Sequence, residues 1–467
     1  MSISPQWGHR YVAEVCEEFW RIERELNLLD VEVLGINVWS LLRMPLYYQT
    51  TTACGFFDSP HPNVEVDGHE SISDHNNQIW DLIQNRKMMS RPRRLWLKYS
   101  PRHLGRDVVI THGRTTSGVD IYTQQIIDES RATTVVFDRT PTPDAHYPDL
   151  LSYRLRHNRE FSQPKIGEVP IEPLQPIFDA ISILEKRFGV DLSAVRDTVA
   201  HKVAYTARQK IHYVRLFKGL ATKRLFITNT YFSSAIVAAA KECNIRVIEL
   251  QHGFISRYHL GYSYPDANAS RYLPDEMWCF GQFWIDETGL DRHIKTRVIG
   301  APYIQHLAAM EAAEHGTAQR IIVTSQGAIG QHLLPVGLQI AENFPESEVI
   351  FRLHPSESLE DMQVMLDELT DATPNNFVLN AKTPNIFALM KSADINVGVF
   401  STTLLEGMAL GIKTVIIALP GFEYMDKIVQ RGDSSIAMTP DEVVEAVRSA
   451  KECADPAYYY AEPTQLL

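Results

Sequence analysis

The chain has 467 residues, which is more than one ordinary hydrophobic core accommodates, so its length predicts two domains. Hydrophobic residues make up 45% and charged residues 22%, a balance typical of a folded globular protein and not of a disordered one. The formal net charge of −12 argues against a general nucleic-acid-binding protein, because such proteins are usually basic.

Cysteine usage and hydropathy predict a cytoplasmic protein. The N-terminal sequence MSISPQWGHR lacks the pattern of a secretory signal, and no stretch reaches the roughly 18 apolar residues of a membrane-spanning helix. The cysteines contain no C-x-x-C pair, which fits a reducing compartment and predicts neither a zinc site nor a disulfide framework. They are Cys16, Cys54, Cys243, Cys279 and Cys453.

The first half of the chain predicts helices around a few short strands. Helical spacing of apolar residues marks three helices, two short apolar runs mark strands, and segments rich in Pro, His, Asp and Asn mark irregular structure. We expect helices at Tyr11–Leu29, Pro176–Phe188 and Ser193–Phe217, strands at Asp107–His112 and Thr133–Asp138, and irregular segments at Thr51–Asn77 and Thr140–Leu174.

The second half alternates strands and helices at the lengths of βαβ units, which predicts parallel sheets. One series starts at Leu225 (LFITN, YFSSAIVAAAKECN, IRVIELQHG) and another at Arg320, and a last helix is expected at Pro440–Cys453. The predicted fold is therefore α/β with two Rossmann-like lobes, parallel sheets, flanking helices and a cleft between the lobes. We assign residues 1–300, with a helical and irregular N-terminal elaboration, to one lobe and 301–467 to the other, with the option that the last helix packs back on the first.

Ligands of such sheets bind beyond the carboxyl ends of the strands, and three polar clusters stand there in the second half. They are Ser325-Gln326-Gly327, Arg352-Leu353-His354-Pro355-Ser356-Glu357, and Ser401-Thr402-Thr403 followed one turn later by Glu406. Hydroxyl groups and free backbone N–H groups at a helix N-terminus suit a phosphate, which the helix dipole also favours. The alternative is that Ser401 and its neighbours only cap the helix.

His354 is the candidate for assisting a leaving group. A histidine beside a bound phosphate can donate a hydrogen bond to it or protonate it, because its pKa is close to neutral pH. The alternative is a packed or capping histidine. Arg352 alternates with His354 along the strand, so both can point to the ligand, but Arg352 can equally turn into the sheet and meet a carboxylate.

The first half offers three candidates for a general base. Gln251-His252-Gly253 ends a strand, and Gly253 suggests a close approach of the backbone. Asp120 can take a proton from an acceptor hydroxyl or can cap the helix expected through Ile121 to Ser130, and Asp138 and His252 are its rivals for the base role.

No metal-binding pattern is found. The sequence has no D-x-D, the usual way of holding a nucleotide diphosphate through a divalent cation, and no Walker loop, G-x-G-x-x-G or G-x-S-x-G. We therefore expect no metal ligands and no cofactor beyond a nucleotide-bound substrate, with leaving-group charge met by Arg, His, hydroxyl groups and a helix terminus.

Seven segments of the chain follow one another in a familiar order. They are QHGFISRYHLGYSYP, PDEMWCFGQFW, RVIGAPY, VTSQG, FRLHPSE, ADINVGVFSTTLLEGMALG and LPGFEYM. Over about Thr228 to Met425 the chain resembles bacterial surface and capsular polysaccharide glycosyltransferases of the GT-B type, in particular the polysialyltransferase-like and Kdo-transferase-like group. VVITHGRTTSGVDIYTQQIIDE resembles the group more loosely.

The resemblance implies a metal-independent, inverting transfer of a sugar from a nucleotide sugar to a polysaccharide or lipid-linked glycan. It implies that His354-Pro355 and Ser401-Thr402 bind the CMP of a CMP-activated ulosonic acid such as Kdo or sialic acid. Glu406 then binds a ribose hydroxyl or acts as a cap. The acidic base motif of some members, Asp/Glu-Asp/Glu-Gly, has no match here, so the base stays among Asp120, Asp138 and His252.

Other functions and one surface stay open. The same fold suits a CDP-polyol phosphotransferase, a UDP-sugar 2-epimerase, or a non-catalytic binding protein of a capsule-assembly complex. Arg86–Arg106 (RKMMSRPRRLWLKYSPRHLGR) concentrates basic and aromatic residues that suit the inner face of the cytoplasmic membrane, although a solvated basic face is the simpler interpretation.

Overall fold

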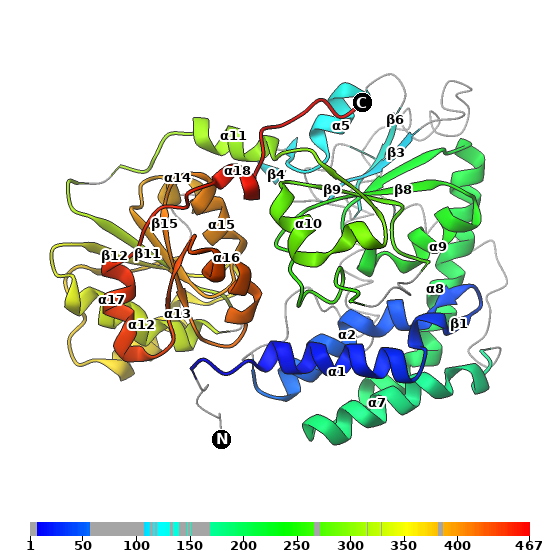
Figure 1. Cartoon of the computed structure of the whole chain (residues 1–467), viewed down its shortest axis with the longest axis horizontal. Coiled ribbons are helices and arrows are strands. Elements are labelled where there is room, and N and C mark those ends of the chain that lie inside the picture. The colour runs from blue at the N-terminus through cyan, green and yellow to red at the C-terminus, as the bar shows by residue number, and fades with distance from the viewer. Residues whose placement is uncertain are drawn as a thin grey trace.

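The computed structural model describes two α/β lobes and a block of helices beside the N-terminal lobe (Figure 1). Each lobe is built around a six-stranded sheet in which every strand pairs in parallel with its neighbours. The predicted fold of two Rossmann-like lobes, with parallel sheets and flanking helices, is confirmed. The described residues are 7–56, 107–112, 115–116, 119–130, 134–139, 147, 150, 169–265, 271–314, 316–327, 329–381 and 386–467.

The sheet of the N-terminal lobe changes direction at its strand β3. The chain passes from β3 to β6 at one edge of the sheet, and then to β7 on the other side of β3. At such a switch point the loops at the carboxyl ends of the strands diverge and leave room for a ligand. In spatial order the strands are β10 (Lys295–Val298), β9 (Glu276–Cys279), β8 (Arg246–Leu250), β7 (Arg224–Ile227), β3 (Asp107–Ile110) and β6 (Thr134–Phe137).

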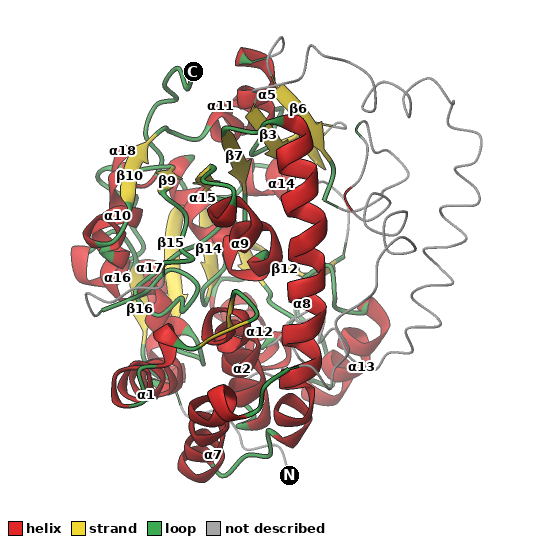
Figure 2. Ribbon diagram, turned by 90° about the vertical axis from the view of Figure 1, so that its right-hand side faces the viewer, coloured by secondary structure: helices red, strands yellow, loops and turns green. Residues whose placement is uncertain are grey.

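Helices cover both faces of this sheet because its strands are apolar on both sides. Val108 and Ile110 of β3 pack towards α8 (Ser193–Leu220) and α9 (Ser234–Glu242), whereas Val109 packs towards α5 (Gln124–Glu129). Figure 2 shows α8 as a long helix running beside α9.

The N-terminal helical block is anchored to the loop that follows β8. Its helices α1 (Tyr11–Glu25), α2 (Val38–Ala53) and α7 (Gln175–Phe188) share one hydrophobic core. Within that core the fully buried Arg43 pairs with Glu23, Nε to Oε1, at 2.5 Å and donates to the carbonyl oxygen of Ser263 at 2.9 Å. A buried guanidinium needs such partners to offset its loss of hydration, so the block fixes the course of this loop.

The sheet of the C-terminal lobe has its switch point between β11 and β14. Its strand order is that of a Rossmann sheet, with β11 in the middle. The strands are β13 (Phe377–Asn380), β12 (Glu348–Arg352), β11 (Arg320–Thr324), β14 (Ile395–Gly398), β15 (Lys413–Ile417) and β16 (Ser435–Ala437). The helices are α12 (Gly330–Asn343), α13 (Leu359–Leu369), α14 (Ile386–Lys391), α15 (Thr402–Ala409), α16 (Asp426–Arg431) and α17 (Val443–Arg448).

The end of the chain returns to the N-terminal lobe. Helix α17 packs against α12 and β16, within the C-terminal lobe. The segment after it, with α18 (Pro456–Tyr459), crosses to α10 (Gln282–Thr288), where Trp284 Nε1 donates to the carbonyl oxygen of Tyr459 at 2.6 Å. Figure 1 shows the C-terminus next to α5 of the N-terminal lobe.

Several element boundaries differ from the expected ones. Helix α1 ends at Glu25, because Asn27 adopts a left-handed conformation with φ +51°. The last predicted helix begins with a 3-10 turn at Pro440–Glu442 and ends at Arg448 rather than Cys453. Just after this end, the Ser449 hydroxyl donates to the Glu445 carbonyl oxygen at 2.8 Å. Helix α5 starts at Gln124 rather than Ile121.

Some predictions lie outside the described residues. These are the basic segment Arg86–Arg106, the irregular segment from residue 57 onward, and most of Thr140–Leu174. Among the residues that the structure does describe, no helix is long and apolar enough to cross a bilayer.

Candidate functional site

The three polar clusters of the C-terminal lobe meet at the switch point of its sheet. They follow the neighbouring strands β12, β11 and β14. Gln326 Oε1 accepts a hydrogen bond from the backbone N–H of Phe400 at 3.1 Å, which ties the loop after β11 to the loop after β14. On its other side, the Ser325 hydroxyl donates to Glu357 Oε1 at 2.8 Å. The loop after β11 therefore holds the other two in a fixed arrangement.

His354 is held in one orientation by its own loop. The backbone N–H of Ser356 donates to His354 Nδ1 at 3.2 Å, and the Ser356 hydroxyl lies 2.7 Å from the same nitrogen. Because a backbone N–H can only donate, Nδ1 is the acceptor, and the proton of the neutral ring is on Nε2. Burial lowers the pKa of His354 below its ordinary value, so the ring is neutral at neutral pH and offers an Nε2–H donor.

Two glycines permit the close packing of these loops. A Cβ atom on Gly327 would lie 2.2 Å from the Ser356 hydroxyl oxygen and 3.3 Å from His354 Nδ1. A Cβ atom on Gly330 would lie 1.7 Å from Glu357 Oε1. Side chains at either position would displace the groups that orient His354. The G-x-x-G spacing at residues 327–330 is thus a packing requirement that the sequence left unexplained.

The third cluster forms the N-terminus of α15. Ser401 is its N-cap, and its hydroxyl accepts a hydrogen bond from the backbone N–H of Thr403 at 3.3 Å. Ser401, Thr402 and Thr403 are all partly exposed. The capping interpretation of Ser401 is therefore correct, and it leaves the hydroxyl groups of Thr402 and Thr403 and the positive end of the helix dipole at the surface.

Two further side chains of this lobe that were predicted to bind the ligand form hydrogen bonds with other residues of the protein. Arg352 donates to Asn380 Oδ1 on the neighbouring strand β13, so it does turn along the sheet, and it meets an amide rather than a carboxylate. Glu406 is 1% exposed and accepts from the Tyr303 hydroxyl at 3.3 Å. Pro355 is exposed beside His354.

The N-terminal lobe brings an aromatic group of side chains to the end of its sheet. His252, after β8, lies 5.1 Å from His112, after β3, between ring centroids. Tyr122 and Tyr231 flank His252 at 6.4 and 6.3 Å. His252 and Gly253 are partly exposed, and a Cβ atom on Gly253 would lie 4.0 Å from the Thr402 hydroxyl oxygen. The loop carrying His252 therefore faces the N-terminus of α15 across the interlobe space.

Asp120 is buried and works as a hydrogen-bond acceptor for its own loop. One carboxylate oxygen accepts the backbone N–H of His112 at 2.9 Å, and the other accepts the Thr123 N–H at 3.0 Å and its hydroxyl at 2.9 Å. Asp138 similarly accepts from the Thr111 hydroxyl and the Tyr147 N–H, each at 3.0 Å. Both carboxylates hold strand-end loops; the N-cap of α5 is Thr123, so Asp120 holds the loop before that helix and does not cap the helix itself.

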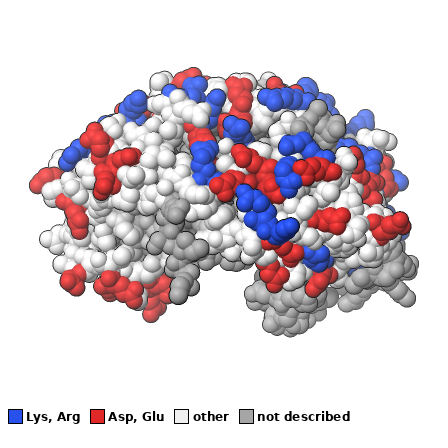
Figure 3. Space-filling model, turned by 60° about the horizontal axis from the view of Figure 1, so that its bottom comes forward, with Lys and Arg blue, Asp and Glu red and all other residues white. Residues whose placement is uncertain are grey.

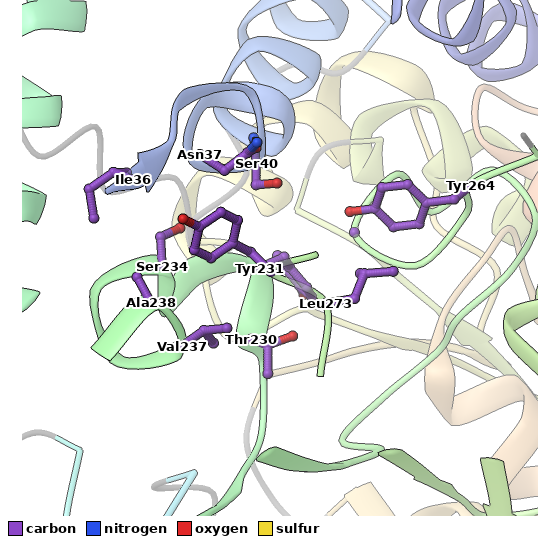
Figure 4. A pocket seen from close by; sticks show the side chains of 12 residues that line it. Ile36, Asn37, Ser40, Thr230, Tyr231, Ser234, Val237, Ala238, Tyr264 and Leu273 are labelled. Atoms are coloured by element: carbon purple, nitrogen blue, oxygen red, sulfur yellow. The ribbon is translucent and has the colours of Figure 1, made fainter. Parts of the chain in front are cut away.

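Two cavities lie outside this interlobe site. The first has a volume of about 30 Å³ beneath Tyr231, between the start of α2 and α9 (Figure 4). It has room for only one or two water molecules. The second, of about 270 Å³, lies between α1, the end of α10 and α16 and carries both acidic and basic side chains. Figure 3 draws one face of the molecule, on which Lys and Arg are interspersed with Asp and Glu.

Within the described part of the chain, no group of three or more His, Cys, Asp or Glu side chains is close enough to hold a metal ion.

Sequence reasoning missed Arg139 and Asn229, which lie at the same edge as His252. Arg139 follows β6 and donates from Nη2 to the carbonyl oxygen of Thr228 at 2.6 Å. Asn229 follows β7 with φ +59°. The sequence feature that could have identified Asn229 is its position at the end of the apolar strand segment LFITN. Arg139 carried no comparable signal, because its burial depends on the pairing of β6 and β3.

No family model matches the sequence, and no curated protein matches it. Solved structures with a similar arrangement include the UDP-GlcNAc 2-epimerase of Neisseria meningitidis bound to UDP-GlcNAc, with 13% identity over 73% of this chain and 90% of that chain and a TM-score of 0.45. A spinosyn rhamnosyltransferase has 12% identity over 74% and 91%, with a TM-score of 0.42. A calicheamicin glycosyltransferase has 13% identity over 76% and 91%, with a TM-score of 0.41. What these proteins bind or transfer is a property of those proteins, and the function of this chain has to be argued from its own residues.

Proposed function

We propose that the protein is a nucleotide-sugar-dependent glycosyltransferase that moves a sugar onto a glycan acceptor by a single, inverting displacement. The observation that carries this proposal is the convergence of the His354 loop and the α15 N-terminus through Ser325 and Gln326, opposite the His252 loop of the other lobe. A donor held by the first set of groups and an acceptor held by the second would meet between the lobes.

The C-terminal loops suit the phosphate of the donor. The N-terminus of α15 offers backbone N–H groups, the hydroxyls of Thr402 and Thr403, and the positive end of the helix dipole. His354 is neutral and adds an Nε2–H donor from a fixed ring. Such donors stabilise the charge that develops on the phosphate as the bond to the sugar breaks, and they need no reorganisation at that moment.

His252 is the proposed base for the acceptor. Asp120 and Asp138 are engaged in holding their own loops, whereas the partly exposed His252 precedes the glycine that faces Thr402. In this mechanism His252 takes the proton of an acceptor hydroxyl, the oxygen attacks the anomeric carbon, and the nucleotide leaves on the opposite side with the bonding electron pair.

The finer part of the proposal concerns the donor. We propose a CMP-activated ulosonic acid such as Kdo or sialic acid, without a metal ion. It is supported by the resemblance of the His354-Pro355 and Ser401-Thr402 pairs to those of bacterial sialyltransferases and Kdo transferases. A single phosphate needs fewer positive charges than a diphosphate, and the lobe supplies one helix terminus and a neutral histidine.

The test is the release of free nucleotide from CMP-Kdo, CMP-sialic acid, UDP-GlcNAc and a CDP-polyol, each with and without glycan acceptors, in the presence of a chelator. We expect rapid release only when an acceptor is present, and a product with inverted anomeric configuration. Conversion of UDP-GlcNAc without an acceptor would replace the proposal by an epimerase. CMP released from the CDP-polyol would replace it by a phosphotransferase.

A further inference from the structure

The edge of the N-terminal sheet holds a cation that the proposed chemistry does not use. Arg139 follows β6, and Thr228 and Asn229 follow β7, so these residues flank β3 on both sides at the switch point of the sheet. Arg139 Nη2 donates to the carbonyl oxygen of Thr228 at 2.6 Å, so the Arg139 side chain lies across the end of β3. A switch point is where sheets of this kind bind their ligands.

Arg139 lacks a counter-ion among the described residues. Its Nε atom is buried without a hydrogen-bond partner, and no carboxylate of the described chain lies within ion-pair distance of it. The acidic group that influences it, Glu249, is already occupied by the Thr230 N–H at 3.1 Å and the Tyr262 hydroxyl at 2.6 Å. Burial lowers the pKa of the guanidinium, because the charged form loses its hydration.

Asn229 adds a second unsatisfied group at the same place. Its Oδ1 atom is buried without a partner, and its backbone adopts the left-handed region at φ +59°, which is costly for a residue other than glycine. Arg139 and Asn229 are partly exposed as residues, although the Arg139 Nε and Asn229 Oδ1 atoms themselves are buried. An unsatisfied buried polar group marks a place where a water molecule or a ligand completes the hydrogen bonding.

We propose that Arg139 binds an oxyanion of the acceptor, a sugar carboxylate or a sugar phosphate, and that Asn229 accepts a hydrogen bond from a neighbouring sugar hydroxyl. This inference rests on the proposed function, because it assigns the acceptor to the N-terminal lobe. Tyr231 connects the two sites: its ring lies 6.3 Å from that of His252, and it is one of the groups that act on the charge of Arg139. A sugar anchored at Arg139 would thus place its next hydroxyl near the base.

The test measures binding of glucuronate, glucose 6-phosphate and glucose to the full chain, by ligand-observed NMR titration at constant ionic strength with nucleotide present. We compare the wild type with Arg139→Gln, Arg139→Lys, Asn229→Gly and the exposed control Arg187→Gln. We expect at least one acidic sugar to bind about 10-fold or more tightly than glucose, which is the usual scale for a charge-assisted hydrogen bond. Binding to glucuronate alone identifies a carboxylate, and binding to glucose 6-phosphate alone identifies a phosphate.

Arg139→Gln should abolish the preference for the acidic sugar, and Arg139→Lys should keep part of it, because lysine retains the charge but not the planar fork. Asn229→Gly suits the left-handed backbone, so this variant folds and reports on the side chain alone; a loss of about 3-fold is expected. Equal binding of acidic and neutral sugars, or an unchanged preference in Arg139→Gln, would overturn the inference. Nucleotide-induced thermal stabilisation, recorded on the same samples, reports separately on the proposed function.

Discussion

The strand-end loops of the two lobes differ in how completely their polar groups are satisfied. In the C-terminal lobe Ser325, Gln326, His354 and Ser401 all bond to other parts of the same site. In the N-terminal lobe the Arg139 Nε and Asn229 Oδ1 atoms are buried and unsatisfied. Under the proposed function, this difference means that the donor side is organised before any ligand arrives, whereas the proposed acceptor side is completed by its ligand. Preorganisation is most useful where charge develops during the reaction.

The largest effect is expected from His354, whose ring is held through Nδ1 and keeps the proton on Nε2. His354→Gln should lower kcat by about 10²- to 10⁴-fold while nucleotide binding changes far less, because the hydrogen bond strengthens as the leaving group gains charge. His306→Gln, at an exposed position of α11 (Pro302–Ala309), is the control. Steady-state kinetics and nucleotide titration separate the two effects, and an unchanged kcat would remove His354 from the mechanism.

The contact between the lobes should make stability depend on pH through Glu423. This residue of the C-terminal lobe accepts the backbone N–H groups of Val12 and Ala13 of α1, and burial raises its pKa from 4.5 to about 7. The folded state then binds more protons than the unfolded state between these values. Stability is highest below about pH 4.5 for this group and is lost as the pH rises through 7, by up to about 3 kcal/mol.

Denaturant unfolding at several pH values checks this linkage. Glu423→Gln should flatten the dependence between pH 4.5 and 8, whereas the exposed Glu360→Gln should leave it unchanged. An equal slope in wild type and Glu423→Gln would show that other groups govern the pH dependence.

The close packing of the donor loops can be disturbed without touching a polar group. Gly327→Ala places a Cβ atom 2.2 Å from the Ser356 hydroxyl oxygen and 3.3 Å from His354 Nδ1, so the Ser356 hydroxyl must leave the position from which it contacts the His354 ring. We expect activity to fall by about 10- to 100-fold, since a displacement of about 1 Å at a reacting group is that costly. Gly316→Ala, with nothing within 4 Å of the added Cβ, is the matched control. Equal activity of the two variants would show that the loop packing is not required.

A smaller effect separates capping from phosphate binding at α15. Ser401→Ala and Ser358→Ala each remove the N-cap of a helix in the same lobe, α15 and α13, and each should cost about 1 kcal/mol of stability. Only Ser401→Ala should also weaken nucleotide binding, by about 3- to 10-fold, because the ordered helix terminus is part of that site. Thermal unfolding and titration calorimetry measure the two quantities, and equal nucleotide affinity in both variants would leave Ser401 as a cap alone.

Local patterns predicted the fold well where strands and helices alternate. The strands at residues 320–324, 348–352 and 395–398 are buried apolar runs that end at polar residues, so each motif could be placed at a strand end from the sequence. Helix α2 escaped prediction because it is apolar on most sides and contains Pro45, which obscures the helical period. The strands β9 and β10 were missed within segments used only as motifs.

The site was only partly predictable, because its decisive features are contacts between distant segments. Sequence proximity suggested that Arg352 and His354 share a role. In the structure, however, Arg352 donates a hydrogen bond to Asn380 on the neighbouring strand and so lies along the sheet. Glu406 follows Thr402 by one helical turn, yet it is buried and accepts a hydrogen bond from the Tyr303 hydroxyl. Arg139 gained its importance only from the pairing that places β6 beside β3. Ligand roles for Arg352, Glu406 and Pro355 stay predictions.

Nucleotide binding decides whether the C-terminal strand-end loops hold the nucleotide of a sugar donor, as we propose. Thermal stabilisation would be recorded with CMP, CDP, UDP, GDP and dTDP in a chelator, and again with Mg²⁺ or Mn²⁺ added, because a ligand of the folded state raises the Tm by mass action. We expect a Tm rise that is largest with CMP, independent of metal, and reduced in Ser401→Ala but not in Ser358→Ala. A larger rise with another nucleotide would overturn the donor assignment, and no rise with any nucleotide would show that these loops do not bind a nucleotide.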